Sequence, residues 1–130
     1  LILVGAPVAF ADHARRAFEL AKRIRDSGIA VTSRWSDAEL QLGVGVGVAS
    51  GYVTVGVIGA ASRLEYTAVG PAVNLAARLC SEAAHGEVLV DARTTELLDA
   101  GSGRAELRPG EALLLKGFQQ PVQSYVLSGA

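Results

Sequence analysis

The chain has 130 residues, half of them hydrophobic, with 12 basic and 13 acidic side chains and a formal net charge of -1. This length and composition fit one globular domain with its own core and argue against a disordered or tail-like chain. The balanced charge and the absence of a long basic run exclude a broad surface for nucleic acid, and no apolar run is long enough to span a bilayer, so we expect no direct membrane contact.

The single cysteine, Cys80, cannot form an internal disulfide, which is typical of a reducing, cytoplasmic location. A parent protein tethered to a membrane would still be compatible with that location. The chain opens on LILV without a methionine. We therefore expect it to be part of a longer protein.

The first elements along the chain are a strand end and a helix. LILV, residues 1–4, predicts the end of a buried strand that turns into a loop. Apolar residues then recur at helical spacing from a plausible N-cap at Asp12, and Gly28 is expected to end this helix. Residues 32–39 are polar and predict a connection.

A period of two follows, in which valines alternate with Gly43, Gly45 and Gly47. This alternation predicts a β-hairpin over residues 42–58, turned at residues 49–51. The glycines also suggest a dinucleotide-binding turn, but such a turn opens a helix, whereas a strand-like sequence continues here. We interpret them as a strand face that a helix or a ligand approaches closely.

The second half of the chain mixes short elements. A helix is expected from Gly70 and Pro71 to Gly86, followed by a strand at residues 87–91. Asp91 is a plausible cap for a short helix over residues 92–100, which Gly101 ends, and strands are expected around residues 104–108, 112–116 and 123–127. This order predicts one α+β domain over residues 1–130.

Asn74 and Arg78 lie four positions apart in the helix expected over residues 70–86. Positions 74, 78, 81, 82 and 85 form one polar stripe, which a helix that simply faces water would also show. Asn74 lies past the capping positions, where asparagine has no local backbone role and only modest helix propensity. The alternative is that both side chains bind a ligand.

Other chemistries have less support. Cys80 lies in the middle of an apolar helix, and the two histidines, His13 and His85, lie at helix ends. Nucleophilic catalysis and a histidine–cysteine metal site are therefore not indicated. Surface roles are the simpler interpretation of both histidines, with a favourable helix-dipole contact for His85.

The string IGAASRLEYTAVGPAVNLAARLCSEAAHGEVLVD, residues 58–91, resembles the core motif of the class III nucleotidyl cyclases. The segments GAP with DHARRA, GVGVASG and LKGFQQPVQSYVL resemble further parts of bacterial members, so the resemblance covers essentially the whole chain. The fold that it implies is α+β and ferredoxin-like, with a mixed, mostly antiparallel sheet, helices packed on one face, and an incomplete N-terminal portion.

The resemblance implies an adenylate cyclase that converts ATP to 3′,5′-cyclic AMP and pyrophosphate. Asn74 matches the residue that orients the ribose, and Arg78 matches the one that binds phosphate oxygens. Thr67 matches the purine-selecting position, where threonine points to ATP, and Lys116 matches a lysine that contacts the terminal phosphates. The simpler interpretations are a strand-forming threonine and an exposed lysine.

The resemblance also implies groups that these residues do not supply. Family members hold two divalent ions, Mg²⁺ or Mn²⁺, with a pair of aspartates at positions upstream of Leu1, and this chain provides no metal ligand. The family's sites form between two catalytic domains, so a homodimer is implied. We expect the chain alone to be inactive, and two alternatives stay open for the parent: a non-catalytic partner domain and a guanylate cyclase.

Overall fold

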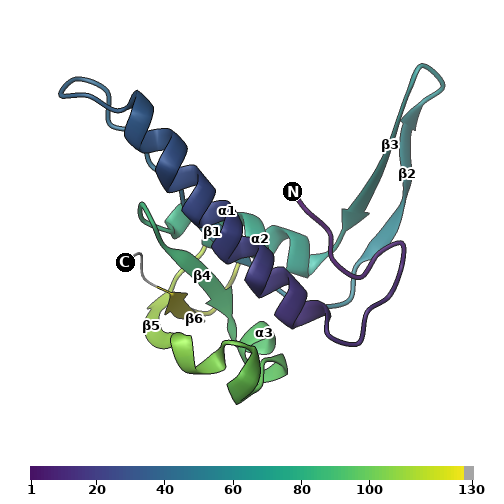
Figure 1. The fold of residues 1–130 in the computed structure, drawn as a ribbon. Coiled ribbons are helices and arrows are strands. Elements are labelled where there is room, and N and C mark those ends of the chain that lie inside the picture. Colours follow the sequence, from purple (N-terminus) through teal and green to yellow (C-terminus); the bar gives the residue numbers. More distant parts are fainter. Residues whose placement is uncertain (128–130) are drawn as a thin grey trace.

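A computed structural model describes residues 1–127 of the chain (Figure 1). The helices are α1 (His13–Trp35), α2 (Pro71–Glu82) and α3 (Ala92–Leu97), with 3₁₀ turns η1 (Ala100–Ser102) and η2 (Arg104–Glu106). The strands are β1 (Val46–Val48), β2 (Thr54–Ala60), β3 (Arg63–Val69), β4 (Val88–Asp91), β5 (Arg108–Leu113) and β6 (Val122–Leu127).

The strands form a four-stranded sheet and a separate hairpin. The sheet has the order β1-β4-β6-β5, in which β1 and β4 are parallel and the other neighbours are antiparallel. Strands β2 and β3 pair only with each other. The predicted α+β fold with a mixed, mostly antiparallel sheet is confirmed.

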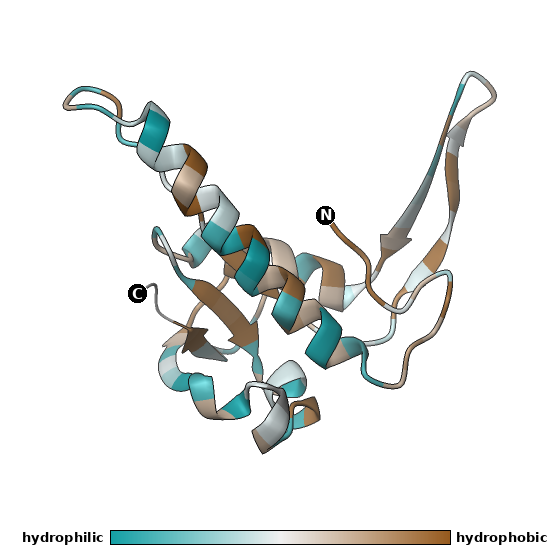
Figure 2. Cartoon of the chain, viewed as in Figure 1, coloured by the Kyte–Doolittle hydropathy of each residue, from teal (hydrophilic) through white to brown (hydrophobic). Residues whose placement is uncertain are grey.

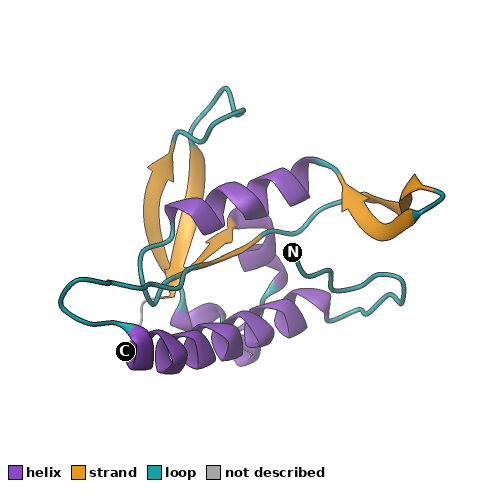
Figure 3. Ribbon diagram, turned by 90° about the horizontal axis from the view of Figure 1, so that it is seen from above, coloured by secondary structure: helices purple, strands orange, loops and turns teal. Residues whose placement is uncertain are grey.

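The helices lie on both faces of the four-stranded sheet (Figure 3). Strand β4 is buried on both sides, and its alternate residues point toward opposite faces. Val88 and Val90 pack with Phe18 of α1 and with Leu98, which follows α3. Leu89, between them, packs with Leu79 of α2 and with Leu115. Helix α2 therefore has a face of the sheet to itself, which differs from the expected placement of all helices on one face.

The N-terminal expectations need correction. Residues 1–4 form no strand and pair with no strand of the described chain. Helix α1 passes through Gly28 and ends at Trp35. Gly28 lets the helix approach the segment before β1: a Cβ there would lie 2.8 Å from Val44 Cγ2. Asp12 does precede the helix, but its carboxylate pairs with Arg15 and Arg16 instead of capping.

The predicted hairpin over residues 42–58 is wrong. Strand β1 pairs with β4, and the hairpin is formed by β2 and β3, which turn between Ala60 and Arg63. The predicted strand at residues 104–108 is the 3₁₀ turn η2, and β5 begins only at Arg108. Each error has the same cause, since strand pairing is decided by partners far away in the sequence.

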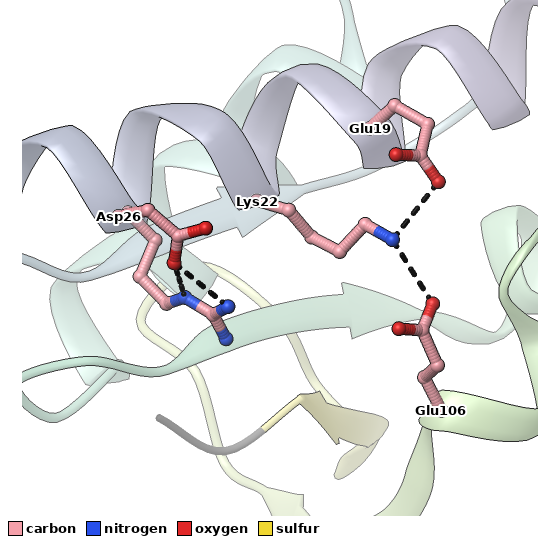
Figure 4. A network of polar contacts seen from close by, with 5 residues as sticks. Glu19, Lys22, Asp26 and Glu106 are labelled. Atoms are coloured by element: carbon pink, nitrogen blue, oxygen red, sulfur yellow. Dashed lines mark hydrogen bonds and ion pairs between the residues drawn. The ribbon is translucent and has the colours of Figure 1, made fainter. Parts of the chain in front are cut away.

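Helix α1 is tied to η2 by a small ionic cluster (Figure 4). Lys22 Nζ lies 2.9 Å from Glu19 Oε1 and 3.0 Å from Glu106 Oε2, and these partners, Glu19 first, raise the pKa of Lys22. Next to the cluster, Gly103 adopts a φ of 103°, and a Cβ there would collide with the Phe18 ring. The segment after α3 thus closes the core over Phe18.

No helix among residues 1–127 combines the length and the apolar character that crossing a membrane requires.

Candidate functional site

Helix α2 presents Asn74 and Arg78 on one exposed face. The helix begins as the sequence predicts: Gly70, with a φ of 155°, is the N-cap, and Pro71 is the first helical residue. Both side chains are exposed, and neither makes a hydrogen bond or ion pair with another residue of the described chain. An amide and a guanidinium separated by one helical turn are therefore available together.

The opposite face of α2 lies directly on the strand segment that contains Gly43, Gly45 and Gly47, which we call the glycine face. A Cβ on Gly47 would lie 2.9 Å from the Leu79 carbonyl carbon and still closer to backbone atoms of Ala76 and Cys80. This confirms the interpretation of these glycines as a close-approach surface. The dinucleotide-binding interpretation fails, because no helix follows the glycines.

Two polar contacts hold the end of α2 to the same segment. His85 Nδ1 accepts a hydrogen bond from the Val44 backbone N–H at 3.1 Å, and the Cys80 thiol donates to the Gly45 carbonyl oxygen at 3.5 Å. His85 therefore has a structural partner, which the sequence could not reveal because Val44 lies far from it along the chain. Neither residue is arranged as a nucleophile or a general base.

Thr67 and Lys116 lie on other elements than α2. Thr67 is half-buried in β3, opposite Gly56, and the chain enters α2 directly after this strand. Lys116 is exposed in the turn between β5 and β6, next to Leu115, which packs on Leu79 of α2. Neither side chain makes a hydrogen bond or ion pair with Asn74 or Arg78. The structure therefore does not bring these two side chains into contact with the pair on α2.

The described residues do not fit a metal centre by themselves. Within residues 1–127, no group of three or more His, Cys, Asp or Glu side chains could hold a metal ion. The most buried carboxylate, Asp91, caps α3, where its Oδ1 accepts from the Thr94 backbone N–H at 3.0 Å, and burial raises its pKa. A pair of divalent ions would need ligands from outside this part of the chain.

The β2–β3 hairpin extends away from the sheet (Figures 1 and 2). Residues that pair across the two strands point to the same face. Val55 pairs with Ala68 and Val57 pairs with Tyr66, so all four side chains point to one side of the hairpin. That side, which we call the apolar face of the hairpin, carries Val55, Val57, Leu64 and Tyr66, all exposed. The other side is mixed: it carries Thr67, Glu65 and Arg63 together with the exposed Ile58 and Val69.

This arrangement was missed by sequence reasoning, although the alternation in residues 54–58 and 64–69 was a usable signal. The misplaced hairpin over residues 42–58 obscured it, because that register leaves residues 63–69 without a partner strand. The apolar face of the hairpin is thus a finding of the structure.

Comparison with known proteins decides the family. The sequence matches the adenylate and guanylate cyclase catalytic domain over residues 1–129. The chain belongs to this cyclase family. Membership of this family is the basis on which the exposed residues Asn74 and Arg78 are interpreted below.

Relatives of this cyclase domain include two uncharacterized proteins of Mycobacterium tuberculosis. One is 38% identical over 95 residues, which are 72% of this chain and 17% of the relative. The other is 35% identical over 127 residues, which are 95% of this chain and 22% of the relative. The chain therefore spans about a fifth of the length of these curated relatives.

Solved structures of both cyclase types share the fold. The adenylyl cyclase CyaB from P. aeruginosa has a TM-score of 0.75 and 28% identity, over 98% of this chain and 65% of that one. The guanylate cyclase domain of RhGC from Catenaria anguillulae, in complex with GTP, has a TM-score of 0.70 and 25% identity, over 97% of this chain and 65% of that one. The fold and the cyclase family are thus established together.

Proposed function

We propose that this cyclase domain belongs to an adenylate cyclase that converts ATP to 3′,5′-cyclic AMP and pyrophosphate. The observation that carries the proposal is the exposed pair Asn74 and Arg78 on α2, in a chain of the cyclase family. Their side chains lack internal partners within the described residues, so a nucleotide would not have to displace any contact.

The reaction needs groups that align two oxygens and neutralise charge. The ribose 3′ oxygen attacks the α-phosphorus, and the bond to pyrophosphate breaks. The Arg78 guanidinium offers several N–H donors in a fixed plane, which suits the nonbridging oxygens of that phosphate, and Asn74 is one turn away to hold the ribose. Lys116 would contact the terminal phosphates, and the divalent ions that the family uses would be held by residues outside this chain.

ATP is preferred over GTP in this proposal because of Thr67. Its hydroxyl can accept a hydrogen bond from the adenine amino group, but it can also donate, so it rejects guanine less firmly than a carboxylate would. We expect turnover with both nucleotides in the complete protein and a higher kcat/KM for ATP. A higher kcat/KM for GTP would make the protein a guanylate cyclase.

The deciding experiment replaces Arg78 in the complete protein. If Arg78 stabilises charge in the transition state, Arg78→Ala should lower kcat about 10²- to 10³-fold, the scale of a single oxyanion-stabilising donor. Arg23→Ala, on the exposed surface of α1, is the matched control and should leave kcat unchanged. Unchanged turnover in Arg78→Ala would refute the assigned role, and no cyclic nucleotide from the unmodified protein would favour a non-catalytic partner domain.

A homodimer is part of the proposal, with the nucleotide site at the interface. The apolar face of the hairpin supports it, since Val57 and Leu64 are each 63% exposed. A second copy would cover this face while leaving Thr67 on the opposite side of the hairpin free for the nucleotide. A cytoplasmic location, where ATP is available and Cys80 stays reduced, remains a prediction.

A further inference from the structure

The glycine face is unusual because at Gly47 the backbone of the strand lies directly against the backbone of α2. Gly47 meets backbone atoms of Ala76, Leu79 and Cys80. Two residues earlier, a Cβ on Gly45 would lie 2.8 Å from both the Cβ and the carbonyl oxygen of Ala83. At the far end, a Cβ on Gly43 would lie 3.3 Å from the His85 Cβ. Gly47 thus meets α2 itself, whereas Gly45 and Gly43 meet its C-cap and a residue beyond the helix, and the contact is tightest at Gly47.

The direction of this contact relates it to the candidate site. With about 3.6 residues per turn, the positions that meet the glycines, 76, 80 and 83, lie about half a turn from Asn74 and Arg78. Any atom added to the glycine face would therefore push α2 outward, in the direction in which Asn74 and Arg78 are exposed. The glycine face sets how far these two side chains stand above the sheet.

The size of the displacement can be estimated. Non-bonded carbon atoms prefer separations of about 3.5 to 4.0 Å, so a methyl group at Gly47 would require α2 to move by about 1 Å. The atoms that it would meet are backbone atoms of a helix, which cannot rotate away as a side chain would. A misplacement of about 1 Å can lower an enzymatic rate about 10²-fold.

We propose that Gly47 is a positioning residue for the cyclase reaction, which fixes the height of Asn74 and Arg78 through direct contact with the backbone of α2. The inference rests on the proposed function and extends it to a residue that touches no substrate. Gly45 contributes to the same positioning, and Gly43 contributes least.

The test is a graded series in the complete protein: Gly47→Ala, Gly45→Ala and Gly43→Ala. The loss of kcat should decrease in that order, with Gly47→Ala lowering kcat about 10²-fold. Gly101→Ala is the matched control, because a Cβ there would meet only Asp99 Oδ1, at an ordinary 3.6 Å. If Gly47→Ala does not fold, Gly45→Ala and Gly43→Ala still give an order that can be checked.

A mutant cycle separates positioning from a general loss of stability. If Gly47 acts through Asn74 and Arg78, Gly47→Ala should cost little further kcat once both of them are already alanine. A purely structural role would instead give losses that multiply, and multiplied losses would overturn the inference. Melting temperatures of all variants show that the folded protein is what is assayed.

A crystal structure of Gly47→Ala supplies a readout that does not depend on activity. We expect α2 to be shifted away from β1 relative to the unmodified protein, with the sheet otherwise unchanged. An unshifted helix would overturn the inference. If the unmodified protein forms no cyclic nucleotide while α2 shifts, the proposed function fails and the structural part of the inference stands.

Discussion

At the scale of single residues, Asp91 combines burial with a capping role. The residue is 4% exposed at the junction of β4 and α3, and its Oδ1 accepts from the Thr94 backbone N–H. The hydroxyls of Thr94 and Ser50 lie 2.7 Å apart beside it. The carboxylate thus ends a strand, starts a helix, and connects to the loop after β1.

Replacement of Asp91 should show which of these roles matters for stability. Asp91→Ala removes the acceptor and should lower the free energy of unfolding by about 1 kcal/mol, whereas Asp91→Asn keeps an acceptor and should lower it less. Denaturant unfolding followed by circular dichroism measures both. If both variants lowered the free energy of unfolding equally, the capping hydrogen bond would contribute little to stability, and the ionised carboxylate would be the stabilising group.

The pH dependence of Asp91 has a defined sign. Burial raises its pKa above the ordinary 3.8, so the folded chain holds this proton to higher pH than the unfolded chain does. The unfolded state then binds fewer protons, and the contribution of Asp91 to stability falls as pH rises from about 4 through the raised pKa. Relative to Asp91→Asn, the unmodified protein should be most stable at the acid end of this window. The opposite trend would contradict the raised pKa.

At the scale of elements, the hairpin offers two neighbouring positions at which a pair of matched variants can test the dimer interface. Val57 and Ile58 are neighbours in β2 with similar exposure, 63% and 53%, but they lie on opposite faces. If a second copy covers the apolar face of the hairpin, Val57→Lys should dissociate the dimer, because it buries a charge without a partner. Ile58→Lys should not.

Sedimentation of the complete protein and its two variants measures this difference. A dimer that survives Val57→Lys, or one that both variants dissociate equally, would show that the apolar face of the hairpin is not the interface. Loss of turnover together with dissociation in Val57→Lys would further support a site between two copies.

At the scale of the whole molecule, the described residues supply part of a cyclase centre. They include the proposed nucleotide contacts on α2, but no cluster that could hold a metal ion lies within residues 1–127. We therefore expect residues 1–130 alone to form no cyclic AMP from ATP with Mg²⁺ or Mn²⁺, while the complete protein does. A chromatographic assay for cyclic AMP measures both, and clear product from the short chain would contradict this expectation.

The sequence predicted best the elements whose signals are local. Gly70 with Pro71 at the start of α2 and Asp91 before α3 were recognised from their neighbours alone, and both are confirmed. Valines recur at every second position on both sides of residues 49–51, so this pattern could not show that β1 and β2 belong to different sheets. Gly28 was expected to end a helix, but the packing of Val44 decides its role.

The candidate site was predictable to a different extent. The positions of Asn74 and Arg78 on one exposed helix face follow from their spacing, and the structure confirms that placement. Their relation to Thr67 and Lys116 could not be predicted from spacing, since it depends on how β3 and the β5–β6 turn reach α2. The sequence correctly predicted that the glycines allow a close approach. Only the structure shows that the element which approaches them is α2, the helix that carries Asn74 and Arg78.

The backbone contact beneath α2 also limits how the proposed cyclase activity could be controlled. Where side chains fill an interface, a helix can slide or roll as rotamers change, whereas at Gly47 the backbone of β1 lies directly against the backbone of α2. A signal that repositions Arg78 must therefore carry α2 and β1 together, and β4 with them, as one rigid block. Control of catalysis would then act by moving the two catalytic domains relative to each other, while the internal structure of each domain stays unchanged.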